Sequence, residues 1–267
     1  MEQPKNNLKI VSEKKNARML LPNMLTLIGV CIGLTSIRFA LDGKFEFAII
    51  AIIFAALIDG LDGRIARLIK GTSKVGKELD SLTDMISFGV APAFIMYFWK
   101  LNTLGRFGWL ICLVYVICVA LRLARFNVNS NQDPSWRDNF FEGVPSPAGG
   151  ILVLTPLIIS ISGFDYIQLN YEIITPIFFI VTSFLLISKF PSYSFKKIVI
   201  QRKATIFLLF GIVLFFGLLL IYTFEVIAIS SMIYLSLLPI SFFHYQNIKK
   251  NNENDKIQDD EDLEDEL

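Results

Sequence analysis

The sequence of 267 residues contains a single histidine and only three cysteines. His244 lies at the end of the last long apolar run, and Cys31, Cys112 and Cys118 all lie inside such runs without a C-x-x-C pair. Imidazole is the usual side chain for proton transfer near neutral pH, and imidazole and thiolate are the usual zinc ligands. We therefore expect neither histidine-based catalysis, nor a zinc site, nor a disulfide framework.

Several short motifs are also absent. The chain has no G-x-x-x-x-G-K-[ST] loop, no G-x-G-x-x-G loop, no H-E-x-x-H motif and no internal repeat. We expect no cleavable signal peptide, because residues 1–18 are polar and the first apolar run, 19–41, is too long for one. We also expect no nucleic-acid partner.

Long apolar runs, in contrast, are abundant. Hydrophobic residues make up 54% of the chain, 24 residues are phenylalanine, and the mean hydropathy is +0.55. This exceeds what a soluble domain needs to fill its core. Apolar runs of about 17 to 25 residues, the length that crosses a bilayer, alternate with polar segments. We predict an all-α polytopic membrane bundle of about eight transmembrane helices, near 20–41, 46–66, 80–99, 106–126, 148–165, 172–190, 204–222 and 225–245.

The positions of lysine and arginine predict the orientation of this bundle. If both termini are cytoplasmic, the outside segments hold only four of the 25 cations, Arg38, Lys44, Lys100 and Arg106. We expect three parts: a polar basic segment over 1–18, a membrane-embedded catalytic domain over 19–245, and an acidic, disordered tail over 246–267. A bacterial inner membrane is the expected location.

Four aspartates occur at fixed spacing where an apolar chain tolerates charge least. The stretch IDGLDGRIARLIKGTSKVGKELDSLTD contains D-x2-D-G-x2-A-R-x8-G-x3-D-x3-D, with Asp59 and Asp62 ending the second predicted span and Asp80 and Asp84 beginning the third. Residues three or four apart on a helix share a face, and the linker 68–79 is short. We therefore expect the four carboxylates to converge at the cytoplasmic side.

Converging carboxylates repel one another unless cations neutralise them. A ligand set made only of oxygens favours Mg²⁺, Mn²⁺ or Ca²⁺, and four aspartates suffice for two ions, which bind phosphate well. Gly63, Ala66 and Gly76 leave space nearby, and Arg67 and Ser73 offer donors, so this region is typical of a diphosphate pocket. A single D-x-x-D would more often be a solvated loop, but the complete pattern is harder to explain in that way.

At every defined position, these residues match the signature of the CDP-alcohol phosphatidyltransferase family. The resemblance implies a membrane enzyme, a homodimer, in which an alcohol hydroxyl displaces CMP from a CDP-linked lipid with the help of two divalent ions, Mg²⁺ or Mn²⁺. It implies that Asp59, Asp62, Asp80 and Asp84 bind metal and that Asp84 is also the proton acceptor. It further implies that the CDP-lipid site comprises Asn23, Thr26, Gly63, Ala66, Arg67, Ser73 and Gly76.

The alcohol is indicated by segments outside the motif. Residues 121–128, 141–150 and 189–197 are similar to members of this family that use serine, which implies CDP-diacylglycerol and L-serine as substrates. Arg122 and Arg125 would bind the serine carboxylate, and Asn127 would bind either end of serine. The alternative for both arginines is ordinary charge flanking a membrane span.

Three rival functions can be compared with a serine transferase, and the first of them stays open. A transferase of the same family could use glycerol 3-phosphate or inositol phosphate, which would need more cations around the acceptor. A divalent-cation transporter would need polar residues on several spans at mid-membrane, and here the carboxylates cluster at one end. A silent scaffold is disfavoured because all four aspartates are present.

Overall fold

The computed structural model describes residues 7–69, 73–129, 140–163, 170–188, 191–193 and 202–265. Within these ranges the chain is helical, except for two strands of three residues, β1 (Phe140–Glu142) and β2 (Pro191–Tyr193), which pair in an antiparallel ribbon. Apart from this ribbon, the predicted all-α class is confirmed.

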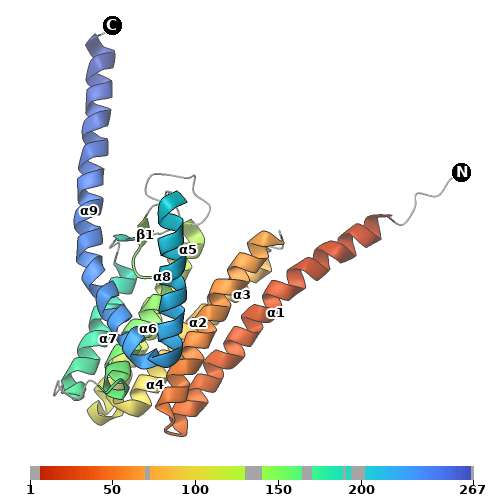
Figure 1. The fold of residues 1–267 in the computed structure, drawn as a ribbon, viewed down its shortest axis with the longest axis vertical. Coiled ribbons are helices and arrows are strands. Elements are labelled where there is room, and N and C mark those ends of the chain that lie inside the picture. The colour runs from red at the N-terminus through yellow and green to blue at the C-terminus, as the bar shows by residue number, and fades with distance from the viewer. Residues whose placement is uncertain are drawn as a thin grey trace, which may run out of the picture. The chain divides into compact units, whose positions relative to one another are not determined.

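The helices form two compact units. The first unit contains α1 to α7, and Figure 1 shows α1 running along α2 and beside α3. The second unit contains the two strands and two packed helices, α8 and α9. The bounds are α1 (Asn7–Leu41), α2 (Phe45–Leu68), α3 (Lys74–Asp84), α4 (Ala91–Trp99), α5 (Arg106–Asn129), α6 (Ser146–Ile161), α7 (Tyr171–Ile187), α8 (Arg202–Ile221) and α9 (Thr223–Asp265).

Within the described residues, each of the eight predicted runs overlaps helical structure. The third run, 80–99, is made by α3, a π-helical segment η1 (Met85–Val90) and α4 in direct succession, and a 3₁₀ turn η2 (Leu101–Leu104) follows. Among the described residues, four helices are long and apolar enough to cross a membrane: Leu21–Leu41, Lys74–Trp99, Arg106–Val128 and Thr223–Phe242. The count of eight spans stays a prediction.

The remaining helices differ from these four in length or charge. With 16 and 17 residues, α6 and α7 are about 24 to 26 Å long, shorter than a hydrocarbon core of about 30 Å. Helix α2 has 24 residues but carries Asp59, Asp62, Arg64 and Arg67 near its end.

Helix α9 continues through Asp265, over most of the segment 246–267 for which we expect disorder. The segment has no glycine or proline and contains lysine, glutamate and glutamine, which favour helix. Low hydrophobicity with high charge predicts that a segment lacks a packed core, but it does not exclude a helix. The division of the chain into three parts stays a prediction.

Helix α6 forms much of the apolar core of the first unit. Eleven of its 16 residues are buried, including Leu152, Leu154 and Leu157. Tyr115 of α5 and Phe179 of α7 are fully buried, with their rings edge to face at 5.3 Å between centroids. This core supports η1, which follows Asp84 directly.

The π-helical segment η1 is held by close contacts with neighbouring helices. The Ser87 hydroxyl donates to the Gly29 carbonyl of α1 at 3.3 Å, and the Tyr115 hydroxyl donates to the Phe88 carbonyl at 2.6 Å. A Cβ on Gly33 would lie 3.1 Å from the Ser87 Cα. Glycine therefore lets α1 approach the backbone of η1.

Gly33→Ala is expected to destabilise the protein by about 1 to 3 kcal/mol, because the added methyl group overpacks the contact between α1 and η1. Thermal unfolding in detergent measures the effect. The matched control is Gly60→Ala, because a Cβ at this helical position meets nothing within 4 Å. An unchanged melting temperature for Gly33→Ala would show that the contact relaxes without cost.

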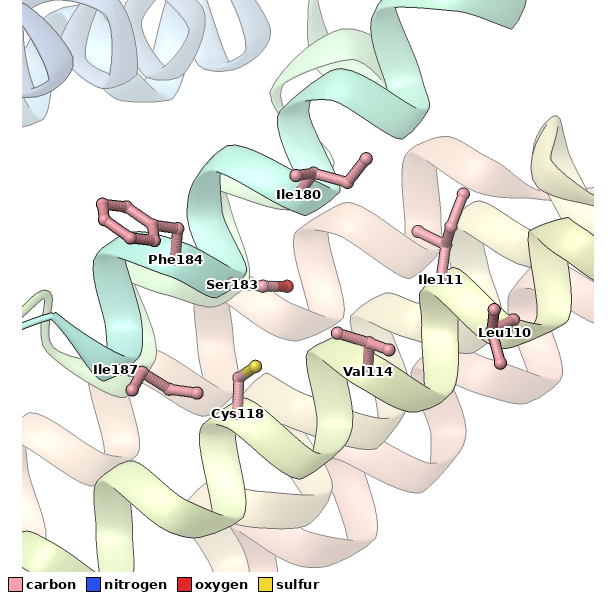
Figure 2. Close-up of a pocket in the computed structure, with 8 residues that line it drawn as sticks. All are labelled: Leu110, Ile111, Val114, Cys118, Ile180, Ser183, Phe184 and Ile187. Carbon is pink, nitrogen blue, oxygen red and sulfur yellow. The ribbon is translucent and has the colours of Figure 1, made fainter.

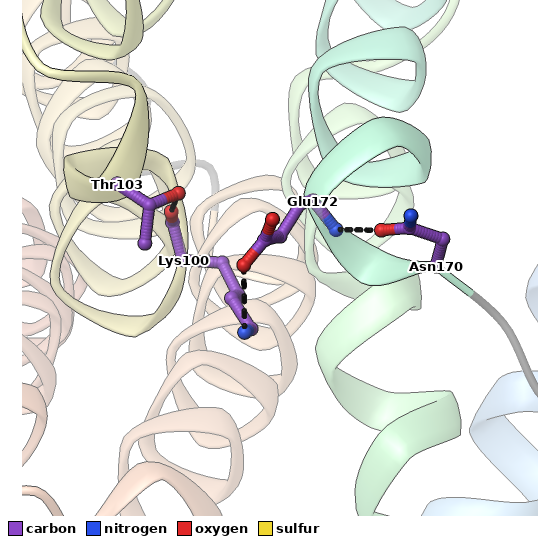
Figure 3. A network of polar contacts seen from close by, with 4 residues as sticks. All are labelled: Lys100, Thr103, Asn170 and Glu172. Carbon is purple, nitrogen blue, oxygen red and sulfur yellow. Dashed lines mark hydrogen bonds and ion pairs between the residues drawn. The ribbon is translucent and has the colours of Figure 1, made fainter.

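A small polar network joins the turn that follows α4 to the start of α7 (Figure 3). Lys100 Nζ and Glu172 Oε1 lie 3.6 Å apart, and the Thr103 hydroxyl donates to the Lys100 carbonyl at 2.8 Å. The Glu172 amide donates to Asn170 Oδ1 at 3.2 Å. Exposed ion pairs of this kind contribute little to stability, so the network orients helix ends rather than forming a core.

Candidate active site

Carboxylates from α2 and α3 meet in the first unit. Asp59, Asp62 and Asp80 each offer an oxygen, and these three oxygens all lie within 4.8 Å of one another. Asp84 follows Asp80 by one turn of α3, and its side chain interacts with that of Asp59. The short linker between α2 and α3 thus brings all four aspartates together, as their spacing predicts.

Asp84 differs from the other three in its surroundings. Its Oδ1 atom is buried and accepts no hydrogen bond from the described part of the chain. The positive charge of Arg122, on α5, acts on Asp84. Arg122 Nη1 donates to the hydroxyl of Ser146, which begins α6. A buried acceptor without a donor is costly, so Asp84 Oδ1 is ready to receive a proton or a cation.

A cavity of about 360 Å³ opens beside the carboxylates. All seven residues expected to bind the CDP-lipid line this cavity, together with Asp62 and Asp80. Its lining comprises Pro22, Asn23, Thr26, Asp62, Gly63, Ala66, Arg67, Ser73, Gly76, Lys77, Asp80 and Phe126. Residues far apart in the sequence, from α1, α2, α3 and α5, therefore surround one space.

Several of these residues have structural partners that the sequence does not reveal. The Thr26 hydroxyl lies 2.7 Å from Asp62 Oδ2, to which it donates, and 3.0 Å from the Pro22 carbonyl. Ser73 caps α3, since its hydroxyl accepts from the Gly76 amide at 2.9 Å. These bonds fix the Asp62 carboxylate and the start of α3, both of which line the cavity.

The two glycines of the motif differ in the space around them. A Cβ on Gly63 would meet nothing within 4 Å, so this position leaves open room beside the carboxylates. A Cβ on Gly76 would lie 2.9 Å from Asn23 Oδ1, so Gly76 lets α3 begin close to α1. Both glycines line the cavity, so a ligand site at Gly63 and Gly76 stays a prediction.

Three lining residues, Pro22, Lys77 and Phe126, are not among those predicted from the sequence. Lys77 precedes Asp80 by three residues, so helical spacing would have placed it on the same face. Phe126 lies beside Arg125 on α5, and no motif marks it. Lys77 adds a second cation to the cavity besides Arg67.

Of the residues expected to bind the serine acceptor, Arg125 and Asn127 are hydrogen bonded to other parts of the protein. Arg125 donates to the carbonyls of Ile187 at 2.6 Å and Leu186 at 3.4 Å, at the end of α7. Asn127 Nδ2 donates to the Ser81 hydroxyl at 2.9 Å, and the Asn127 carbonyl accepts from Lys77 Nζ at 3.2 Å. These bonds tie α5 to α7 and α3, whereas Arg122 lies within electrostatic range of Asp84.

The carboxylate cluster suits hard divalent cations. The three oxygens within 4.8 Å come from aspartate alone, and the buried Asp84 Oδ1 atom needs a partner. Mg²⁺, Mn²⁺ and Ca²⁺ prefer such oxygen ligands. The residues present therefore fit a divalent metal, and the adjoining cavity, with Arg67 and Lys77, fits an anion such as a diphosphate.

Comparison with protein families gives one decisive match. The family model described as CDP-alcohol phosphatidyltransferase matches residues 19–182, which include the aspartates and most of the first unit. The chain belongs to the CDP-alcohol phosphatidyltransferase family. The resemblance of the motif is thus confirmed over more than half of the chain.

Within this family, the chain is similar to proteins named CDP-diacylglycerol–serine O-phosphatidyltransferase. The relative from Helicobacter pylori strain 26695 is 35% identical over 201 residues, which cover 75% of this chain and 83% of the relative. The one from Bacillus subtilis is 33% identical over 177 residues, covering 66% and 92%. The one from Mycobacterium leprae is 47% identical over 137 residues, covering 51% and 45%.

The alignments cover very different shares of these relatives. The chain spans about half the length of the mycobacterial relatives that it matches, but most of the other two proteins. Membership in this family and four helices able to cross a membrane together indicate an integral membrane protein.

Proposed function

We propose that this protein transfers the phosphatidyl group of CDP-diacylglycerol to the hydroxyl of L-serine, which forms phosphatidylserine and releases CMP. The observation that carries the proposal is one cavity of about 360 Å³ in which the family's aspartates adjoin two cations, Arg67 and Lys77. We infer serine as the acceptor from the names of the relatives from H. pylori, B. subtilis and M. leprae.

The proposed substrate site follows from the lining of the cavity. The diphosphate of the CDP-lipid would lie near Arg67 and the open space at Gly63, with Ala66, Ser73 and Gly76 around it. Asn23 and Thr26, from α1, would contact the nucleotide part of the CDP-lipid. The aspartates exclude a free anion from this site, so binding requires that their charge be neutralised.

In the proposed reaction, Asp84 accepts the proton of the serine hydroxyl as its oxygen attacks the phosphorus next to the diacylglycerol. A new bond forms between the serine oxygen and that phosphorus. The bond from phosphorus to the bridging diphosphate oxygen breaks, and CMP leaves with that oxygen. The buried Asp84 Oδ1, which accepts no hydrogen bond within the described residues, is the atom suited to take the proton.

Asp59, Asp62, Asp80 and Asp84 would hold two divalent ions, Mg²⁺ or Mn²⁺. When bound, such ions neutralise the diphosphate and stabilise the charge that develops on departing CMP. Thr26 supports this arrangement, because its hydrogen bond holds the Asp62 carboxylate in one orientation.

Arg122 is the proposed ligand of the serine carboxylate, because it comes from α5 and its charge acts on Asp84. A carboxylate bound to Arg122 would bring the serine hydroxyl toward the base. Arg125 and Asn127 are proposed to contribute less directly, because the bonds described above link them to α7 and α3.

The proposed membrane arrangement has eight spans, both termini and the aspartates on the cytoplasmic side, and a homodimer in a bacterial inner membrane. The distribution of cations supports this orientation, since only four of the 25 fall on the other side. Serine and the released CMP, both soluble in water, would then exchange with the cytoplasm, while the lipid stays in the bilayer.

CMP release by the purified protein tests the proposed function. CDP-diacylglycerol and Mn²⁺ are supplied with L-serine, glycerol 3-phosphate, inositol phosphate or no acceptor. Release that depends on serine is expected. CMP release with glycerol 3-phosphate or inositol phosphate, but not with serine, would keep the transferase reaction and show that serine is not the acceptor. No CMP release with any acceptor would contradict the proposal.

Arg122→Ala is expected to raise the KM for serine on the order of tenfold or more, because a charged hydrogen bond to the carboxylate is lost. The KM for CDP-diacylglycerol should change little. Arg125→Ala is the matched comparison on the same helix, and we expect it mainly to lower the melting temperature, because it uncaps α7. Equal effects of Arg122→Ala on both substrates would instead indicate a nucleotide or folding role.

A further inference from the structure

A groove with an apolar lining runs between α5 and α7 in the first unit (Figure 2). Its volume is about 310 Å³. Figure 2 shows side chains from the two helices bordering the space between them, with Cys118 near Ile187 at one end. The lining includes Leu110, Val114 and Cys118 of α5 and Ile180, Phe184 and Ile187 of α7.

The lining of the groove offers no unsatisfied hydroxyl group that would need to bind water. Ser183, which also lines it, donates its hydroxyl to the Phe179 carbonyl of its own helix at 2.7 Å. Helix α5 is long and apolar enough to cross a membrane, and α7 is a shorter apolar helix whose charged residue, Glu172, lies in its first turn. Within a bilayer, such a hollow is filled by hydrocarbon, because water is absent there.

One end of the groove is close to the candidate active site. Arg122 follows Cys118 by four residues, which is about 6 Å along α5, and the charge of Arg122 acts on Asp84. Arg125 donates to the carbonyl of Ile187, at the same end. The opposite end, at Leu110 and Ile180, is apolar. An apolar groove with one end near Asp84 suits the hydrocarbon chain of a lipid whose phosphate lies at the active site.

We propose that this groove holds one acyl chain of the CDP-linked lipid, an inference that rests on the proposed function. Any membrane phospholipid shares this chemistry, but the position of the groove favours the substrate. The reacting phosphate must lie beside Asp84 while its chains extend into the bilayer, and the groove leads away from Arg122 over about 12 Å of α5. It therefore accommodates part of one chain and leaves the second to the bilayer.

Photolabelling of the full-length protein tests this assignment. The probe is CDP-diacylglycerol with a photoreactive diazirine midway along one acyl chain, and labelled residues are identified by mass spectrometry. We expect labels on the residues of α5 and α7 that line the groove. Excess unlabelled CDP-diacylglycerol should remove this labelling, whereas the same excess of phosphatidylcholine should not.

Two variants of α5 provide matched controls. Val114 lines the groove and Ile117 does not, and both side chains are about half exposed, at 46% and 56%. Val114→Trp should fill the groove and reduce its labelling several-fold, whereas Ile117→Trp should leave the labelling unchanged. Melting temperatures show whether each variant is folded, and Ile180→Trp fills the same groove from α7 if Val114→Trp is unstable.

Three results would overturn the inference: labelling outside the groove, labelling that phosphatidylcholine removes equally well, or labelling that survives both tryptophan substitutions in the groove. Serine-dependent CMP release is measured on the same preparation. Normal release without groove labelling would contradict this inference alone, whereas absent release would contradict the proposed function whatever the labelling shows.

Discussion

Asp84→Asn is expected to lower the turnover number by about 10²- to 10⁴-fold, the usual contribution of a positioned general base. The amide has almost the same shape as the carboxylate but cannot take the proton of the serine hydroxyl. Because Asp84 Oδ1 is buried and accepts no hydrogen bond from the described residues, no hydrogen bond to this atom is lost when the charge is removed. Binding of CDP-diacylglycerol should be largely retained, and steady-state CMP release together with lipid binding measures both.

The matched control is Asp42→Asn, which makes the same chemical change at an exposed position after α1, away from the cluster. It should leave turnover unchanged. Near-normal turnover of Asp84→Asn would exclude Asp84 as the proton acceptor. Loss of lipid binding along with turnover would instead assign it to metal or substrate binding alone.

Removal of divalent cations with a chelator is expected to reduce CMP release to background, because the repulsion among Asp59, Asp62 and Asp80 would then oppose diphosphate binding. Excess Mg²⁺ or Mn²⁺ should restore activity. The same ions should raise the melting temperature, since a ligand at about 100 times its Kd stabilises the folded state by about 2.7 kcal/mol.

The stabilisation by metal has its own controls, which do not depend on activity. Asp62→Asn should reduce the rise in melting temperature on metal binding, because one of the three clustered carboxylates is lost. Asp42→Asn should leave this rise unchanged. A melting temperature that does not respond to Mg²⁺ or Mn²⁺ in the unsubstituted protein would contradict a metal site at these aspartates.

The helices could be predicted because apolar length and charge are local properties of the sequence. The run predicted at 106–126 corresponds to Arg106–Asn129, and the run at 46–66 corresponds to Phe45–Leu68. The π-helical segment after Asp84 could not be predicted in this way. Its stabilising bonds come from distant residues, Tyr115 to the Phe88 carbonyl and Ser87 to the Gly29 carbonyl.

The candidate site was predictable where its residues follow one another on a helical hairpin. Spacing alone implies that Asp59 and Asp62 face Asp80 and Asp84, and the structure brings these carboxylates together. Tertiary contacts carry no such local signal. The bonds from Arg122 to Ser146 and from Arg125 to the end of α7 depend on how α5, α6 and α7 pack, so the sequence could not distinguish the two arginines.

The most direct test of the central claim uses L-serine carrying ¹⁸O in its hydroxyl group. Transfer of phosphatidyl to serine predicts that the label appears in the phosphatidylserine formed, in equal amount to the CMP released, and that the CMP is unlabelled. Label in a CMP–serine product would mean attack at the other phosphorus. CMP release without labelled phosphatidylserine would contradict the proposed serine transferase.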